Sequence, residues 1–524
     1  MRKAWWVIVM VLSIGGTGLI FWWVRRQSIP PDPRVLVRQL YEENCAVCHG
    51  TQGDGQGQAA YLLQPKPRDF TLGKYRLVST DNGQPTRDDL FRTLSNGLPG
   101  TAMPPWAHLS NDQRLALADY VLDFGRQSWI ERAMQQGDSR PEAEAFAGDM
   151  IQPGNPIPIP PEPPRTDSSI QSGKQIFRDV CAKCHGEQGE GMWDPSWRTA
   201  EGFPVWSRAF QAGVFKGGSE GAQLFLRMAA GLPGSPMPAS EETGEQIWQT
   251  VHYIQSLYDP EAQTRATVSA HELVAQRSPE LPPDPDASEW SSVPEQWIAL
   301  MPLWFSEEAV EGVRVKAVHD GSRVTFRLEW RDASLDEQVV QQTAFPDGAA
   351  IQFSADASPP LFAMGAAGRT VKIWHWKAVW EKDRDGYQEV SSAFPAMASD
   401  AYLGEESGWN SQPYDDPTYL PAMKLDNPVA RRERHGQIED ANVAGFGTLT
   451  SRAPEEGSVQ GLGRWDGGVW RLQVTRDLEG VGAQDVSFEP GKAISVAFAV
   501  WNGSAGDRNG QKAVSIWNTL RLEP

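Results

Sequence analysis

The chain is poor in cysteine, in positive charge and in long apolar segments. Only 4 of its 524 residues are cysteine, far too few for a small secreted scaffold braced by disulfides. Acidic residues outnumber basic ones by 67 to 48, and the formal net charge is −19. This balance argues against a nucleic-acid binder, because such proteins need a basic footprint. The length corresponds to about three domains.

One long apolar run is present, at the start of the chain. Residues 4–24 contain no charged side chain, and basic residues flank them on both sides. In a helix this run would cover about 30 Å, the thickness of a bilayer hydrocarbon core. Tryptophans near both ends suit the membrane interfaces. We therefore predict an uncleaved transmembrane anchor over residues 1–27; the alternative is a cleaved signal peptide.

A tandem repeat follows the apolar run. Each copy begins with a CxxCH motif, Cys45–His49 or Cys181–His185, and later has a GLPG turn with a Met-Pro pair just after it. Met103 follows His49 by 54 positions, and Met237 follows His185 by 52. Each copy ends in a helical pattern, at 111–124 with Asn111 as N-cap and at 242–257.

Composition divides the rest of the chain. A stretch with seven prolines in fourteen residues separates the copies, and a shorter one follows the second copy. From about residue 289 the pattern is that of short strands: a hairpin over 313–330 and strands at 349–353, 371–376, 469–475, 493–501 and 513–520. Residues 383–463 remain unassigned. The boundaries that we predict are 28–136 and 169–260 for the repeats, 137–168 and 261–288 for linkers, and 289–524 for the β domain.

The CxxCH spacing predicts covalent heme c. Two thiols separated by two residues can add to the vinyl groups of one porphyrin, and the adjacent histidine can ligate its iron. Cys45, Cys48, Cys181 and Cys184 are then attachment points, and His49 and His185 are iron ligands. A shared zinc site would have to join two distant motifs, and a redox dithiol needs no following histidine.

Each iron needs a sixth ligand or an open position. Met103 and Met237 are the candidates, because a thioether is a common axial partner of histidine in cytochromes c. His108 is a competing ligand in the first copy, although the second copy has no histidine at that place.

On these residues the two copies resemble class I cytochrome c domains, over 35–127 and 169–258. PRDFTLGKYR, PTRDDL and GLPGTAMPPW in the first copy are similar to small domains of membrane-associated oxidoreductase complexes. The resemblance implies a few helices around a mostly buried heme, with Arg68 and Arg76 near its propionates. The second copy has EGMWDPSWRTAEGFPVW in place of PRDF, so these arginine contacts are not carried over there.

The C-terminal phrases VRVKAVHDGSRVTFRLEWRDAS, VKIWHWKAVW and FAVWNGSAGDRNGQKAVSIWNTLRL carry a second resemblance. They are similar to the heme b-binding domain in the gamma subunits of ethylbenzene dehydrogenase, dimethyl sulfide dehydrogenase, selenate reductase and nitrite oxidoreductase. That resemblance implies a β-sandwich with one noncovalent heme b between Met364 and Lys512. Lys377 and His375 are alternative ligands, and a domain without heme is also possible.

The fold class that we expect is multidomain: an N-terminal transmembrane helix, two all-α cytochrome c domains and a C-terminal all-β sandwich. No acid, base or nucleophile constellation is evident, so the function expected is electron transfer by a non-catalytic subunit. The resemblance implies partners, namely a molybdopterin catalytic subunit and an iron–sulfur subunit of the nitrite oxidoreductase or nitrate reductase type, and a soluble or membrane redox partner.

Two alternatives are open. One is a free-standing membrane cytochrome that delivers electrons to a terminal oxidase. The other is a diheme cytochrome whose β domain only docks a partner. In each case attachment of heme c takes place on the outer side of the membrane, which predicts a periplasmic position for the heme domains.

Overall fold

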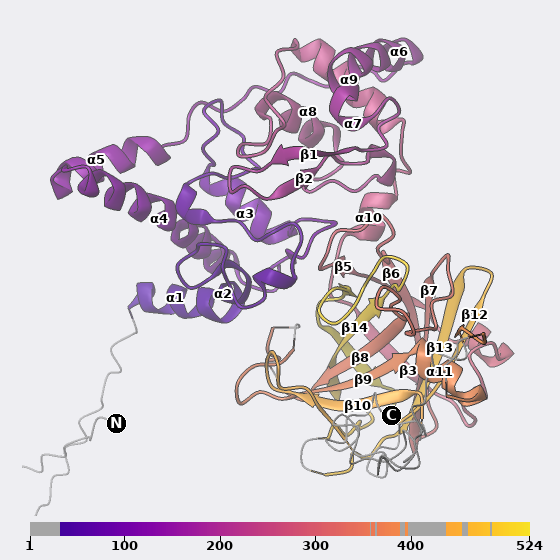
Figure 1. Cartoon of the computed structure of the whole chain (residues 1–524). Coiled ribbons are helices and arrows are strands. Elements are labelled where there is room, and N and C mark those ends of the chain that lie inside the picture. The colour runs from indigo at the N-terminus through magenta and orange to yellow at the C-terminus, as the bar shows by residue number, and fades with distance from the viewer. Residues whose placement is uncertain are drawn as a thin grey trace, which may run out of the picture.

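The computed structural model describes residues 32–356, 358–361, 364–387, 393–396, 436–452, 459–482 and 485–524. The predicted anchor over residues 1–27 lies outside the described residues. Among the helices that are described, none has both the length and the hydropathy needed to cross a membrane. The two repeats lie together on one side of the molecule and the β domain on the other (Figure 1).

The first repeat is helical. Its core contains Tyr41, Leu94, Leu117 and Val121, each less than 9% exposed. The helices are α1 (Pro33–Asn44), α2 (Ala46–His49), α3 (Arg87–Asn96), α4 (Asn111–Gln135) and α5 (Arg140–Ile151), with short 3₁₀ turns η1 (Ala60–Leu62) and η2 (Phe70–Leu72).

Two expectations about this repeat are corrected. The N-cap of α4 is Ser110 rather than Asn111, because Ser110 and Gln113 form a reciprocal capping box. Part of the predicted linker over 137–168 is helix α5, which packs against α4 through Ala143 and Ala147. The prolines that follow this segment favoured a linker in the prediction, because the apolar stripe that packs on α4 is short.

The second repeat mixes helices with a hairpin. Its helices are α6 (Asp167–Ile176), a π-helical turn η3 (Phe177–Cys181), α7 (Ala182–His185), α8 (Gly221–Ala230), α9 (Gly244–Gln255) and α10 (Ala262–Ala266). The strands β1 (Trp193–Arg198) and β2 (Pro204–Trp206) pair antiparallel. The expected all-α domain is therefore wrong here: the segment that departs from the first copy forms this hairpin.

The β domain is two packed sheets. The strands are β3 (Glu272–Arg277), β4 (Gln296–Ala299), β5 (Met301–Pro302), β6 (Gly312–His319), β7 (Arg323–Arg331), β8 (Gly348–Ser354), β9 (Val371–Lys377), β10 (Ile438–Val443), β11 (Thr450–Ser451), β12 (Gln460–Asp466), β13 (Val469–Asp477), β14 (Ala493–Trp501), β15 (Ala513–Val514) and β16 (Asn518–Leu522). Short helices α11 (Ala378–Lys382) and η6 (Asp383–Asp385) follow β9, and η5 (Ser288–Ser292) precedes β4.

Strand β3 joins the two sheets. It pairs in parallel with β16 and, through its last residues, with β6. Leu273 and Ala275 on β3 are buried in the core that both sheets share. The predicted linker over 261–288 therefore contributes a strand to the β domain, and the predicted strand over 513–520 is two short strands, β15 and β16. The unassigned region 383–463 includes β10, β11 and part of β12.

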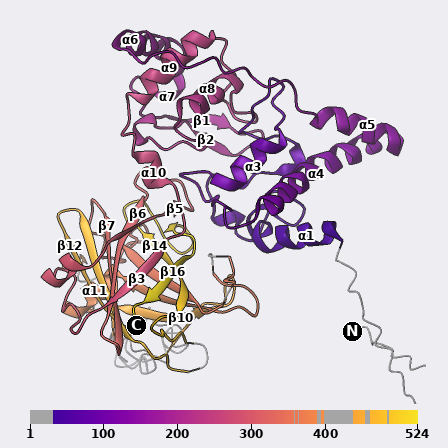
Figure 2. The same ribbon diagram turned by 180° about the vertical axis from the view of Figure 1, so that it is seen from behind.

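The β domain contacts the first repeat through backbone hydrogen bonds. Gln64 donates to the carbonyl of Leu303 at 2.9 Å, and Phe305 donates to the carbonyl of Gln64 at 2.8 Å. Leu303 also donates to the carbonyl of Lys512 at 2.9 Å. Seen from behind, α10 lies where the second repeat meets the β domain (Figure 2). Nε2 of Gln64 also donates to the carbonyl of Pro204 in the second repeat at 3.4 Å, so the three parts of the chain meet at Gln64.

Candidate heme-binding centres

Each CxxCH motif forms one helical turn. In the first repeat, His49 N donates to the Cys45 carbonyl at 2.9 Å and Cys48 N at 3.2 Å, which places all three side chains on the same turn. In the second repeat the π-helical turn η3 ends at Cys181, and α7 carries Cys184 and His185. Single π turns inside helices are frequent at functional sites.

Three of the four thiols are unsuited to dithiol redox chemistry. Burial raises the pKa of Cys45 to about 12, and those of Cys48 and Cys181 to about 11. A reactive dithiol needs a lowered thiol pKa. Among the described residues, the one group of side chains with the spacing of an ion site is Asp332, Asp336 and Asp347, so the cysteines form no such cluster.

The predicted histidine ligands are oriented in the same way in both repeats. Nδ1 of His49 lies 3.1 Å from the carbonyl oxygen of Arg68, and Nδ1 of His185 lies 3.1 Å from that of Arg208. Burial lowers the pKa of His49 to about 4 and also lowers that of His185. Each imidazole is therefore neutral, with Nδ1–H donating to a carbonyl and Nε2 left as the ligand atom.

The predicted methionine ligands lie on matching loops. Leu98 donates to the carbonyl of Met103 at 3.0 Å, and Leu232 to that of Met237 at 3.1 Å. A hydroxyl at the same place in each loop, Thr101 or Ser235, bridges the turn. The duplicated sequence thus has a duplicated loop geometry.

All of these residues face one cavity. It has a volume of about 1420 Å³ and is lined by both CxxCH motifs, by Met103 and by Met237. A single small-molecule site usually occupies about 300 to 1,000 Å³, so this cavity has room for more than one group. Its walls are largely apolar, with Leu63, Leu90, Leu94, Val121 and Phe210 among them. Such walls suit the faces of a porphyrin.

The same cavity contains buried cations from both repeats. Lys216 and Arg208 line it and are partly buried, and among the described residues neither has a side-chain hydrogen bond or ion pair. Burial and the neighbouring guanidinium of Arg208 hold the pKa of Lys216 well below its ordinary value. Nε of Arg76 is enclosed without a hydrogen-bond partner. Charged groups in an apolar cavity are costly unless they are paired with opposite charges. The propionates of heme would provide these negative charges, so the residues that line the cavity fit heme.

The β domain gathers its candidate ligands around one tryptophan. Met364 packs against an apolar cluster that includes Trp501. Nζ of Lys512 lies 4.6 Å from the centre of the Trp501 ring, and the His375 ring stacks on that ring at 4.5 Å. Burial lowers the pKa of Lys512 to about 8. A lysine must be neutral to bind iron, so this surrounding suits the role that the sequence predicts for it.

Known proteins resemble this chain part by part. The family model described as "Ethylbenzene dehydrogenase" matches residues 287–513, "Cytochrome C oxidase, cbb3-type, subunit III" matches 36–121, and "Cytochrome c" matches 170–258. This chain is an electron-transfer cytochrome. It carries two cytochrome c domains, which imply heme c, and one domain of the ethylbenzene dehydrogenase gamma type, as the sequence predicts.

Three curated relatives align with about half of the cytochrome. A "Putative respiratory nitrate reductase heme subunit ORF7" of Haloferax mediterranei is 26% identical over 46% of this chain and 69% of its own. A "Dimethylsulfide dehydrogenase subunit gamma" of Rhodovulum sulfidophilum is 25% identical over 51% and 84%. A "Chlorate reductase subunit gamma" of Ideonella dechloratans is 21% identical over 45% and 79%.

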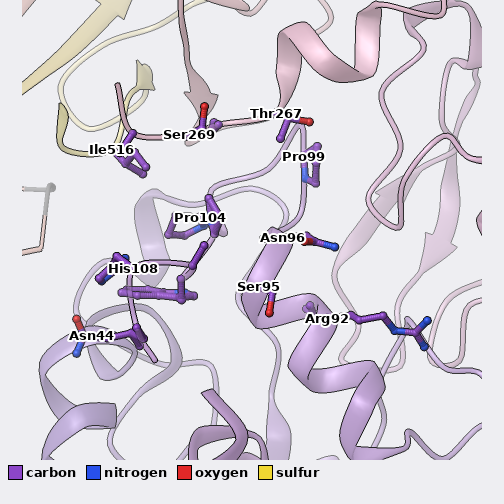
Figure 3. A pocket seen from close by; sticks show the side chains of 18 of the residues that line it. Asn44, Arg92, Ser95, Asn96, Pro99, Pro104, His108, Thr267, Ser269 and Ile516 are labelled. Carbon is purple, nitrogen blue, oxygen red and sulfur yellow. The ribbon is translucent and has the colours of Figure 1, made fainter. Parts of the chain in front are cut away.

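The competing ligands of the cytochrome lie elsewhere or are engaged. His108 lines a second cavity, of about 940 Å³, at the junction of the three parts. Figure 3 shows Arg92 and His108 of the first repeat on one side of it and Ser269 and Ile516 on the other. Lys377 forms an ion pair with Glu439, and Nδ1 of His375 lies 3.7 Å from that carboxylate.

Two cations that line the cavity, Arg208 and Lys216, were missed by the sequence reasoning. Arg208 occupies in the second repeat the place that Arg68 has in the first. A signal existed: both are followed two positions later by a phenylalanine, Phe70 or Phe210, whose ring stacks on the histidine at 4.6 or 4.4 Å. The hairpin before Arg208 places this R-x-F pattern farther from the CxxCH motif than in the first repeat, so the two patterns do not align in the sequence.

Proposed function

We propose that this chain is the heme subunit that passes single electrons between a molybdenum and iron–sulfur oxidoreductase, of the nitrite oxidoreductase or nitrate reductase type, and the respiratory chain. The observation that carries the proposal is the single cavity shared by both CxxCH motifs. Heme supplies a one-electron couple of its iron when bound. The chain provides the cysteines, axial ligands and apolar enclosure that fix the position and potential of that couple.

The oriented histidines, the matching methionine loops and the shared cavity support the following ligands. Cys45 and Cys48 with His49 and Met103 would hold one heme c. Cys181 and Cys184 with His185 and Met237 would hold a second. Met364 and Lys512 would hold a noncovalent heme b, and the Trp501 ring beside Lys512 would form part of its pocket.

A short connection between the β domain and the shared cavity supports this electron path. The carbonyl of Lys512 accepts a hydrogen bond from Leu303, whose own carbonyl accepts one from Gln64. Gln64 lines the cavity, as do Pro302 and Phe305 of the β domain. The proposed b-heme ligand is therefore two backbone hydrogen bonds away from the wall of the c-heme cavity.

The proposed location is the periplasmic side of the membrane, with residues 1–27 as a single-pass anchor. Heme c attachment on that side and the apolar N-terminal run support it. The proposed partners are a molybdopterin catalytic subunit, an iron–sulfur subunit and a soluble or membrane redox protein.

Pyridine hemochrome analysis of the purified full chain tests the proposal. We expect two c hemes and one b heme per chain. A double variant Cys45→Ser/Cys48→Ser should lose one c heme, and the matched Cys181→Ser/Cys184→Ser variant should lose the other. Two c hemes without b would leave only the docking alternative. Purification without a molybdenum subunit under mild conditions would favour the free-standing cytochrome.

A further inference from the structure

Arg68 and Arg208 are equivalent residues whose side chains cross between the repeats. Each holds the histidine of its own repeat through its backbone carbonyl. Its guanidinium, however, lies at the methionine loop of the other repeat. Two glycines show how close the side chains come. At Gly100, in the Met103 loop, the position that a Cβ atom would occupy is 3.4 Å from Nη1 of Arg208. At Gly234, in the Met237 loop, the corresponding position is 3.8 Å from Nη1 of Arg68.

Charged side chains gather where the two repeats meet. We call this region the seam; it comprises Arg68, Arg76, Glu201, Arg208 and Lys216. Arg68 forms an ion pair with Glu201 of the second repeat, and Lys216 and Arg76 lie nearby. Among the described residues, Glu201 is the one carboxylate that forms an ion pair with any of these four cations. Oε2 of Glu201 and Nε of Arg76 are both enclosed without a hydrogen-bond partner. The seam has an excess of buried positive charge that the described residues do not neutralise.

We propose that the seam binds heme propionates and that each arginine serves the heme of the other repeat. Arg208 binds a propionate of the heme held at Cys45–His49, and Arg68 binds a propionate of the heme held at Cys181–His185. Lys216, which is close enough for its charge to interact with both arginines, serves both. This inference rests on the proposal that each repeat holds one heme c. It goes further, because it makes the potential of each heme depend on a side chain from the other repeat.

The sign of that dependence follows from electrostatics. A cation beside a heme stabilises the reduced iron, which has one positive charge fewer than the oxidised iron. In a dry cavity this interaction is screened far less than in water. Removing the guanidinium leaves the propionate charge without a counter-ion, so reduction of that heme becomes less favourable.

To test whether each arginine acts on the heme of the other repeat, the redox waves of the two c hemes must be distinguished. A Met237→His background lowers the potential of the second heme, so the remaining high-potential wave in a spectroelectrochemical titration belongs to the first. In this background Arg208→Gln should lower the equilibrium constant for reduction in that wave at least tenfold, which is 59 mV for one electron. Arg68→Gln should change it much less. In a Met103→His background the two arginines should exchange roles.

Controls separate charge from structure. Arg208→Lys and Arg68→Lys retain the positive charge and should restore most of each shift. Arg198→Gln, on the exposed β1 strand, and Arg87→Gln, exposed on α3, should leave both waves in place. Lys216→Met should lower both waves.

Three results would overturn the inference, and each is distinct from failure of the proposed function. If each arginine shifts only the heme of its own repeat, the subsite is not crossed. If neither shifts either heme, the seam binds no propionate. If the lysine variants shift the waves as far as the glutamine variants, charge is not the cause. The proposed function fails instead when the unmutated chain contains fewer than two c hemes.

Discussion

The guanidinium of Arg227, on α8 in the second repeat, donates a hydrogen bond of 2.7 Å to the backbone carbonyl of Val78 in the first repeat. A longer one, of 3.5 Å, reaches the carbonyl of Arg76. Burial lowers the pKa of Arg227 to about 10, which still leaves it charged at neutral pH. The two repeats are thus joined by a charged group that binds backbone, and side-chain substitution in the first repeat cannot remove its acceptors.

Arg227→Gln should therefore weaken the contact between the repeats. Loss of a charge-assisted hydrogen bond at a half-buried site costs about 1 to 3 kcal/mol. We expect the denaturant midpoint for loss of the heme Soret band to fall accordingly. Arg87→Gln, which breaks an exposed ion pair with Asp119, is the control and should change the midpoint little. Equal midpoints for the Arg227→Gln variant and the unmutated chain would contradict the role given to this contact.

Replacing a methionine ligand should lower one c-heme potential. Met103→His exchanges the thioether for a nitrogen ligand, which favours oxidised iron more. We expect a fall on the order of 0.1 V for one heme, within the range of about 0.8 V that axial ligation spans. The charge-transfer absorption typical of methionine-bound ferric heme should fall by about a third, because Met237 and Met364 would still bind the other two irons. Met134→Leu, an exposed change on α4, serves as the control. A titration unchanged by Met103→His would exclude Met103 as a ligand.

Lys512→Ala should remove the noncovalent heme alone. The pyridine hemochrome of this variant should show both c hemes and no b heme, because the thioether bonds do not depend on Lys512. Lys492→Ala, whose side chain is 70% exposed, is the matched control and should retain b heme. Met364→Leu should also lose it. Full b-heme content in the Lys512→Ala variant would exclude Lys512 as a ligand. His375 would then be the next candidate, because its ring stacks on the same tryptophan.

Asp332 should make the β domain less stable at high pH. Burial and the neighbouring Asp347 carboxylate raise the pKa of Asp332 to about 7, whereas an unfolded aspartate titrates near pH 4. The folded chain therefore holds a proton that the unfolded chain has released, and stability falls as the pH rises from about 4 to about 7, by at most about 1.4 kcal/mol per pH unit.

Asp332→Asn tests this pH dependence because it removes the titrating group. Relative to the unmutated chain, the thermal midpoint of the β domain in the variant should rise between pH 4.5 and pH 8. The exposed Asp466→Asn change is the control. A difference between Asp332→Asn and the unmutated chain that stays constant with pH would show that Asp332 does not titrate in this window.

Local chemistry could be predicted from the sequence because it depends on spacing. CxxCH places its cysteines and histidine on one helical turn in both repeats, and the hairpin over 313–330 follows from alternation of apolar residues. β6 and β7 confirm that hairpin. The repeated Met-Pro after GLPG likewise marked two loops with the same backbone hydrogen bonds.

What could not be predicted depends on contacts between distant segments. Nothing local tells a reader that Arg208 reaches the loop of Gly100, because that contact exists only once the repeats are packed. Strand β3 is six residues long, and its two buried residues, Leu273 and Ala275, are too few to signal a strand inside a polar stretch. Helix α5 has a similarly short apolar stripe, which α4 must cover before the helix is stable.

The parallel pairing of β3 with β16 has a consequence for how the molecule is made. Strand β16 is formed by Asn518–Leu522 and begins 241 positions after β3 ends at Arg277, so β3 can pair with it only after the intervening β domain has been synthesised. Both CxxCH segments emerge long before that moment. Porphyrin attachment can therefore precede closure of the β domain, and a nascent chain could receive its covalent cofactors while the last domain is still open. A β domain produced from residue 289 onward would lack β3, and its two sheets would be left without the strand that joins them.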